Sequence, residues 1–419
     1  MSHLSNPVPL KAARALALHC QGLAAPDIAQ TIAPDTAAIY RAIEQVGCIQ
    51  IDTLQMVQRS QYIALWSRLG TYDPADFDAL IYGAGVDDRR LFEYWLHAAC
   101  LIPLSEYRYA LPNMAHHRNN STRNSRWFEE TGNQHVVALV RERIAAEGGL
   151  RTSDFQDDGP RRGSWWNWKP AKRALEMLYN QGELMIADRV NFQRVYEQAD
   201  RVLPDWVDQT TPTPEETRQF YVERAVKTFG LSQAKHIAEY SKAKVSEVRR
   251  TMADLLAQGV LLEVEVVLVD GAVDSFVLHR DQRSLLALAL AGEVTAERTT
   301  FLSPFDSLFW AKGRDEQFWG FVQRLEAYKP APERIWGYFS LPILHRDRLV
   351  GRFDPKLERK TGILRLKALR LEPAVEPTAD LVQAVAATMR DFMVFHKATD
   401  LVIEQSHPAA FGDKLIKAL

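Results

Sequence analysis

One short pattern occurs twice in this chain, a helix that ends at Gln-Gly and is followed by a hairpin. The first copy is Leu175–Gly182 (LEMLYNQG) and the second is Met252–Gly259 (MADLLAQG), with the two glycines in register. Glycine just beyond a helical period is a common helix end. Residues 183–196 and 260–280 then favour two-stranded hairpins, the second turning at Asp270-Gly271. A repeat of this kind indicates that the two segments are copies of one supersecondary unit.

Amphipathic helices precede each hairpin. The apolar spacing predicts helices at Gln134–Glu147 and Pro170–Gln181 in the first copy, and at Glu216–Phe229, from Leu231 onward, and at Ser246–Gln258 in the second. Helices followed by a hairpin form the order of a winged helix-turn-helix. The N-terminal part favours a third, more degenerate copy, with helices at Lys11–Gln21, Asp35–Val46, Leu54–Leu69, Pro74–Tyr82 and Leu91–Cys100 and an extended segment at Cys48–Asp52.

Beyond Gly292 the pattern changes to strands followed by a long helix. Strands are expected at Trp336–Leu344, Arg348–Asp354 and Gly362–Leu371, and a helix at Ala379–Lys397. We therefore predict a mixed α/β (α+β) fold that is mainly α, with tandem winged helix-turn-helix units and a C-terminal β-rich region. The expected domains are residues 1–130, 131–209, 210–292 and 293–419.

The composition is that of an ordinary globular protein and excludes several classes. Of 419 residues, 47% are hydrophobic and 25% charged, so wholesale disorder is excluded. No apolar run reaches the roughly 18 residues of a membrane helix, and the N-terminus has no signal-peptide core. Three dispersed cysteines, Cys20, Cys48 and Cys100, form neither a disulfide framework nor a zinc cluster. We expect a cytoplasmic monomer.

Basic runs stand out against a net charge of -2. His116–Arg126 and Ser241–Arg250 are two of them, and Arg161–Arg173 (RRGSWWNWKPAKR) combines five cations with three tryptophans and no acid. Such runs are typical of phosphate contact or of an ordinary solvated face. The tryptophans suit either stacking on sugars or packing of the domain. The candidate DNA contacts are Arg161, Arg162, Lys169, Lys172, Arg173, Arg249 and Arg250.

Several familiar catalytic motifs are missing from the sequence. It contains no G-x-x-x-x-G-K-[ST] phosphate loop, no complete dinucleotide fingerprint, no H-E-x-x-H and no G-x-S-x-G. His116-His117 are neighbours and cannot face one metal from a helix. We accordingly expect no metal and no cofactor.

Gln50 and Asp52 form the strongest candidate site. In an extended segment, residues two apart point to the same side, and the intervening Ile51 points into the core. An amide and a carboxylate on one face can hold one water molecule between them. The alternative is that Asp52 simply caps a helix beginning near Thr53.

The wider sequence resembles the bacterial winged-helix DNA glycosylases that unhook interstrand crosslinks, the YcaQ-like group. Gln50-Ile51-Asp52 matches their Gln-apolar-Asp motif. The resemblance continues in order along nearly the whole chain, through Arg59-Ser60, Leu65–Gly70 (LWSRLG), Leu91–Ala98 (LFEYWLHA), Trp165–Pro170 (WWNWKP), Arg201–Pro204 (RVLP), Leu302–Asp306 (LSPFD) and Val350–Lys356 (VGRFDPK). Gln55–Gln58 (QMVQ) departs from the apolar or small residues usual there, which bears on the breadth of substrates.

The resemblance implies a monofunctional glycosylase that hydrolyses the N-glycosidic bond of N7-alkylguanine in double-stranded DNA. Asp52 would activate water and stabilise the oxocarbenium-like sugar, while Gln50 orients the water. The motif contains no lysine, so simple hydrolysis is expected rather than Schiff-base chemistry. Arg59 would bind a phosphate beside the lesion, pair with Asp52 or serve a structural role.

Three questions stay open at this point. Winged helices also serve non-catalytic transcriptional regulators, although a regulator has no reason to carry Gln50-Ile51-Asp52. Glu93 and His97, four residues apart on an expected helix, would be able to touch, and His97 is either functional or a structural histidine. The hairpins at Asp270-Gly271 and around His345 are the candidates for entering a DNA groove.

Overall fold

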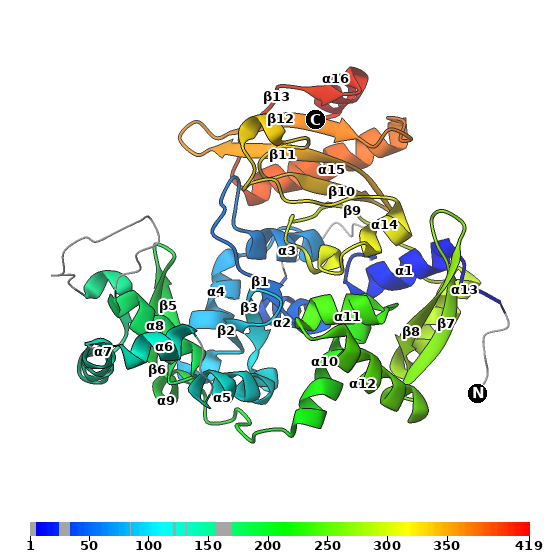
Figure 1. Ribbon diagram of the computed structural model, residues 1–419. Coiled ribbons are helices and arrows are strands. Elements are labelled where there is room, and N and C mark those ends of the chain that lie inside the picture. Colours follow the sequence, from blue (N-terminus) through cyan, green and yellow to red (C-terminus); the bar gives the residue numbers. More distant parts are fainter. Residues whose placement is uncertain (1–5, 25–33, 84, 120–122, 131, 156–169) are drawn as a thin grey trace. The chain divides into compact units, whose positions relative to one another are not determined.

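The computed structural model describes residues 6–24, 34–83, 85–119, 123–130, 132–155 and 170–419 (Figure 1). Backbone contacts divide the chain into two compact units. Unit one contains residues 1–74, 96–100 and 218–419, and unit two contains residues 75–95 and 101–217. The helices and strands together make a mixed α/β fold that is mainly helical, as the sequence predicts. The division into two units does not test the four shorter segments expected from the repeats.

Unit one consists of a helical part and a large sheet. Its helices are α1 Leu10–Cys20, α2 Thr36–Val46, α3 Ser60–Leu69, α10 Pro214–Phe229 (except its first turn), α11 Ala234–Ser241, α12 Val245–Ala257, α13 Arg283–Ala291, α14 Arg314–Trp319, α15 Ala379–Phe395 and α16 Ala409–Ala418. Its strands are β1 Ile49–Gln50, β7 Leu261–Val267, β8 Val273–His279, β9 Thr299–Phe301, β10 Leu341–His345, β11 Arg348–Glu358, β12 Ile363–Leu371, β13 Asp400–Ile403 and β14 Ser406–His407.

Unit two is smaller and also mixes helices with short strands. Its helices are α4 Pro74–Tyr82, α5 Leu111–Asn119, α6 Arg123–Glu129, α7 Asn133–Glu147, α8 Pro170–Asn180 and α9 Ala199–Val202. Its strands are β2 Leu91–Trp95, β4 Leu150–Arg151, β5 Leu184–Val190 and β6 Gln193–Gln198, and β3 Ala99–Pro103 begins in unit one and ends in unit two.

The chain passes three times through helix, a short extended segment, further helical residues and hairpin. The extended segment is a short strand in the first two copies and the single residue Ser232 in the third, and each time it pairs with the second hairpin strand. Ile51 N–H donates to the carbonyl of Ala99 at 2.8 Å, Leu150 of β4 pairs with Tyr196 of β6, and Ser232 bridges to Val277 of β8. A shared pairing rule is stronger evidence of one repeated unit than helix spacing alone.

The helix expected at Leu54–Leu69 is shorter in the structure and begins at Ser60. Residues 52–59 form a non-helical loop that is held by contacts which helical spacing does not reveal. The Leu54 N–H donates to Asp52 Oδ1 at 2.8 Å, and the Leu357 N–H of β11 donates to the carbonyl of Met56 at 2.9 Å. Backbone groups engaged in this way cannot complete a helical turn. In Figure 1 this blue segment rises from β1 toward the orange sheet.

The helix expected at Leu91–Cys100 is wrong, because the segment forms β2, a turn and the beginning of β3. Phe92, Tyr94 and Trp95 are aromatic residues, which favour strands when a pleated surface is available. The turn at residues 96–98 lacks glycine, so the usual hairpin signal was absent.

The C-terminal sheet has the order β13-β12-β11-β10-β9, with β14 also pairing with β12. Helix α15 packs on it through Phe392, whose ring lies 5.5 Å from Phe301 and 4.9 Å from Trp66 of α3. Aromatic packing of this kind buries large apolar areas. It attaches α3, and therefore the segment carrying Asp52, to the sheet.

Candidate active site

Gln50 and Asp52 lie where β1 ends, and their burial alternates as an extended segment requires. Ile49 and Ile51 are buried, whereas Gln50 and Asp52 are half-buried. Gly47 precedes them with φ of 84°, and a Cβ there would collide with the Tyr240 hydroxyl. Glycine at this position therefore lets the chain pass from α2 into β1. This alternation of burial is what the sequence predicts for an extended segment whose two polar side chains lie on one side.

Residues 52–59 form a tight loop around Asp52. Arg59 Nη1 donates to the carbonyl of Thr53 at 3.0 Å and closes the loop. Arg359 Nη2 donates to the carbonyl of Val57 at 2.7 Å, which adds a second tie to the sheet. Because Asp52 bonds the N–H of Leu54 inside this loop, it caps no helix, and α3 begins at Ser60 with Arg59 as its N-cap.

Burial raises the pKa of the Asp52 carboxyl, and this effect outweighs the backbone N–H groups of Leu54 and Thr53 and the charge of Arg59, which lower it. A raised pKa makes the ionised carboxylate a better proton acceptor. Arg59 thus acts on Asp52 electrostatically while also bonding the loop backbone. Perturbed carboxylates at a surface are frequent at functional sites.

A small cavity lies beside Gln50. Its volume is about 10 Å³, about the space that one water molecule needs. It is lined by Val46, Cys48, Ile49, Gln50, Ser60, Ala64, Arg68, Phe305, Asp306, Ser307 and Trp310. Asp52 is not among the described residues that line the cavity. The cavity therefore adjoins Gln50 but does not connect Gln50 with Asp52. Ser60 Oγ donates to the Gln50 carbonyl at 3.2 Å.

The floor of the cavity is a buried ion pair that sequence reasoning missed. Arg68 donates to both oxygens of Asp306, at 2.7 and 3.0 Å, and also to Gln21. Ser307 Oγ donates to Gln21 Oε1 at 2.7 Å. Bidentate pairs with additional hydrogen bonds satisfy buried charges. Both partners lie in motifs quoted for the resemblance, LWSRLG and LSPFD, which was the available signal.

His97 contacts Trp310, one of the residues that line this cavity. Its ring stacks on Trp310 with centroids 4.5 Å apart and an interplanar angle of 4°, and its Nδ1–H donates to the Glu239 carbonyl at 2.8 Å. Burial lowers the pKa of His97, so the ring is neutral at neutral pH. The partners of His97 are therefore Glu239 and Trp310. The predicted contact between His97 and Glu93 required a helix, and this segment is not helical.

Glu93 belongs to unit two and is fully paired there. Arg189 donates to its two oxygens at 2.6 and 2.7 Å, Tyr82 donates at 2.6 Å, and Arg194 lies 3.5 Å away. Burial would raise the pKa of Glu93, but these partners outweigh it and the pKa is lowered. The arrangement indicates a structural carboxylate.

A family model described as DNA glycosylase AlkZ-like matches residues 43–395 of this chain. The chain belongs to the AlkZ-like DNA glycosylase family. Among solved structures, the Streptomyces sahachiroi DNA glycosylase AlkZ is similar, with a TM-score of 0.62 and 15% identity over 96% of this chain and 100% of that chain. At this identity, the likeness indicates a shared fold.

Family membership confirms the resemblance seen in the sequence and decides between the two hypotheses it left open. This AlkZ-like protein is a DNA glycosylase, an enzyme that acts on DNA, rather than a non-catalytic regulator. No helix among the described residues is long and apolar enough to cross a membrane. Within the same residues, no group of three or more His, Cys, Asp or Glu side chains is arranged to hold a metal ion.

The predicted DNA contacts of this glycosylase occupy different environments. Arg161, Arg162 and Lys169 lie outside the described residues, as do Trp165, Trp166 and Trp168. Lys172 and Arg173 are half-buried on α8, and the Arg173 guanidinium lies 5.1 Å from the Trp127 ring. Arg249 and Arg250 are exposed on α12. Their exposure leaves the two α12 arginines accessible to a phosphate.

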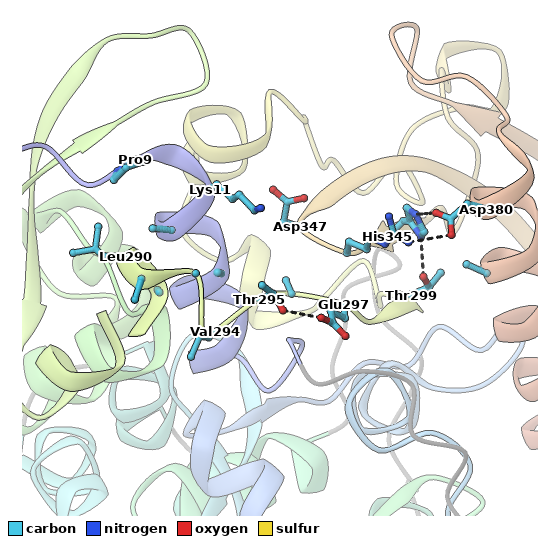
Figure 2. Close-up of a pocket in the computed structure, with 18 residues that line it drawn as sticks. Pro9, Lys11, Leu290, Val294, Thr295, Glu297, Thr299, His345, Asp347 and Asp380 are labelled. Carbon is cyan, nitrogen blue, oxygen red and sulfur yellow. Dashed lines mark hydrogen bonds and ion pairs between the residues drawn. The ribbon is translucent and has the colours of Figure 1, made fainter. Parts of the chain in front are cut away.

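A separate cavity of about 920 Å³ lies between α1, the end of α13 and the β10–β11 turn (Figure 2). His345 is held there by Thr299, whose Oγ1 lies 2.8 Å from Nδ1, and by Asp380, whose Oδ2 lies 3.4 Å from Nε2. Figure 2 shows the three side chains joined in a row. Gln50 and Asp52 do not line this cavity among the residues described, so it is distinct from the candidate active site.

Proposed function

We propose that this glycosylase hydrolyses the N-glycosidic bond of N7-alkylguanine in double-stranded DNA, including guanines tied into interstrand crosslinks. An N7-alkylated purine already carries positive charge and leaves without prior protonation. The reaction then needs one group that stabilises the developing sugar cation and delivers water to C1′. One carboxylate is sufficient for both tasks.

Asp52 is the residue we assign to this role. The supporting observation is a single half-buried carboxylate with a raised pKa, fixed in a closed loop at the end of β1. As a base it accepts a proton from water, and as an anion it stabilises the oxocarbenium-like centre. Gln50, on the same side of the segment, orients the water through its amide, which both donates and accepts.

DNA binding is assigned to the repeated helix-and-hairpin units. We propose that each is a winged helix, which uses a helix in a groove and a hairpin against the backbone. The exposed Arg249 and Arg250 on α12 support this for the third copy. The monomeric state and the cytoplasmic location stay predictions. The same is true of the DNA contacts at Lys172, Arg173, Arg59, Arg161, Arg162 and Lys169. A crosslinked base cannot flip freely, so recognition has to work on a base that stays tethered.

The test is cleavage of a duplex that contains one 7-methylguanine. The enzyme should release the free base, and strand breaks should form only after heating with alkali. Asp52→Asn should lower the single-turnover rate by at least about 100-fold with little change in DNA retention on a gel. Gln50→Ala should lower the rate by about 10-fold because the water loses one orienting group.

Asp35→Asn is the matched control for Asp52→Asn. Asp35 caps α2 through the Ala38 N–H, and asparagine caps equally well while removing the same charge. Equal activity of Asp52→Asn and the wild type would remove the proposed role of Asp52. A parallel loss of DNA retention would make the residue structural instead. A duplex carrying a defined N7 crosslink then tests unhooking directly.

A further inference from the structure

Two apolar side chains project into solvent from one loop of unit one. Tyr328 is 79% exposed and Ile335 is 58% exposed, both on the segment 322–338 that precedes β10. These values are the largest and third largest among the exposed large hydrophobic residues of the described chain. Covering exposed apolar surface is favourable in water, so this loop is a candidate contact surface.

The loop that carries them is held by two buried carboxylates. Glu326 accepts the consecutive N–H groups of Ile335 and Trp336 at 2.8 and 2.7 Å. Asp354 of β11 accepts those of Tyr338 and Phe339, both at 2.9 Å. Hydrogen bonds to a charged acceptor are among the stronger ones in proteins. The backbone beneath the two apolar side chains is therefore fixed.

Two further contacts close the same loop. Lys329 pairs with Glu326 at 2.9 Å, and Arg334 Nε donates to the carbonyls of Glu326 and Lys329. A preordered loop loses little conformational freedom when it binds a partner. The geometry is that of a rigid element presenting apolar groups, in contrast to a flexible surface loop.

Strand β11 attaches this loop beside the segment that carries Asp52. Arg352 Nη1 donates to the carbonyl of Val322 and Asp354 holds residues 338–339, while Leu357 binds Met56. Positions 354 and 357 on one strand are separated by about 10 Å. Partial burial, the charge of Asp52 and Tyr338 raise the pKa of Tyr328, which agrees with this attachment of the loop through β11.

We propose that Tyr328 and Ile335 form an apolar wedge that inserts against the base stack at the lesion, beside Asp52. The proposal rests on the proposed function and adds how the damaged nucleotide is held. Exposed apolar side chains unstack a base step when they enter DNA, and aromatic rings stack on bases regardless of sequence. A lesion that stays tethered to both strands cannot leave the helix, so unstacking from outside exposes its glycosidic bond to Asp52.

The ring of Tyr328, rather than its hydroxyl, does the work in this proposal. Tyr328→Phe should therefore behave like the wild type, and Tyr328→Ala should not. Tyr328→Ala is expected to reduce the preference for 7-methylguanine duplex over undamaged duplex by about 10-fold, and Ile335→Ala by about 3-fold. Ile416→Ala, which truncates an exposed isoleucine on α16, is the matched control and should change neither value.

The direct readout is fluorescence of a 2-aminopurine placed next to the lesion, measured in the Asp52→Asn background so that the base stays attached. With the wild-type loop, the fluorescence should rise when the enzyme binds, because unstacking removes the quenching of 2-aminopurine. Tyr328→Ala should abolish most of this rise. A rise equal to that of the wild-type loop would overturn the wedge, as would loss of the rise in Tyr328→Phe.

Failure of the wedge and failure of the proposed function give different results. If Asp52→Asn still releases the base, the assignment of Asp52 falls, and the loop variants are then compared on a duplex whose lesion nucleotide carries a 2′-fluorine and keeps its base, so that the fluorescence still reports on the wedge. Truncation of exposed side chains leaves the buried anchors Glu326 and Asp354 intact, so folding is preserved. Thermal unfolding of each variant checks this, and an unchanged midpoint with a lost fluorescence rise supports the wedge.

Discussion

Asp52 and Glu93 are both carboxylates close to the start of the chain, yet their surroundings differ in every respect. Asp52 is half-buried, bonds backbone N–H groups of its own loop, and has a raised pKa because burial prevails. Glu93 is buried, receives a bidentate arginine, a second arginine and a tyrosine, and has a lowered pKa despite that burial. The Asp52 carboxylate therefore accepts a proton more readily than an ordinary aspartate. The Glu93 carboxylate is stabilised in its ionised form by its partners.

The difference fits the catalytic role that we propose for Asp52 and a structural role for Glu93. Full pairing stabilises a charge but removes its ability to accept a proton near neutral pH. Sparse pairing costs some stability and leaves the group basic. The two residues therefore predict opposite responses to the same chemical change, carboxylate to amide.

The largest expected effect is on the folding of the region around Glu93. Glu93→Gln leaves Arg189 buried without its charged partner, so the free energy of unfolding should fall by about 3–5 kcal/mol. Asp52→Asn keeps the acceptor for the Leu54 N–H and removes a desolvated charge, so it should change stability by less than about 1 kcal/mol. Urea unfolding followed by circular dichroism measures both variants. Similar decreases in the free energy of unfolding of the two variants would contradict the difference described between Asp52 and Glu93.

The pH dependence of activity sharpens the comparison. In the proposed mechanism Asp52 has to be ionised. Its folded pKa lies above the usual 3.8, so kcat/KM should begin to fall at a higher pH than it would with an ordinary aspartate. Glu93, with its pKa lowered, stays ionised to lower pH and retains its pairing there. The expected result is reversible loss of activity while circular dichroism is unchanged.

Folding itself also weakens in acid, which sets a control for this experiment. Burial, with help from Arg359, holds the pKa of His396 at about 3, below its ordinary 6.5. The unfolded chain therefore binds the extra proton first, and the stability from His396 is lost as pH falls from about 6.5 toward about 3. If activity is lost over the same pH range as ellipticity, the loss of activity reflects unfolding rather than protonation of Asp52.

The smallest effect concerns exposed cations that neither carboxylate touches. Replacing Arg249 and Arg250 on α12 together by alanine should weaken binding a few-fold, equally for damaged and undamaged duplex, and reduce the salt slope by about 2. Filter binding at several salt concentrations measures this. Lys414→Ala with Lys417→Ala on α16 is the charge-matched control. A change in lesion preference would argue against a pure phosphate role.

Local spacing in the sequence correctly predicted much of the fold. Helices α2, α12 and α15 and strand β12 lie within a residue or two of their expected bounds, because apolar periodicity reports one buried face. The alternation of Gln50, Ile51 and Asp52 was readable for the same reason. The ordered motifs along the chain also indicated the family, which the family model confirms.

Tertiary contacts decided what spacing could not. Backbone bonds from β11 kept residues 52–59 out of helix α3, and strand pairing converted Leu91–Cys100 from an expected helix into a hairpin. The Arg68–Asp306 pair joins residues 238 positions apart. Strand β11 bonds both the loop that carries Tyr328 and the loop that carries Asp52. Periodicity records which face of a segment is buried, whereas the partner on that face is chosen by long-range packing, hydrogen bonding and charge.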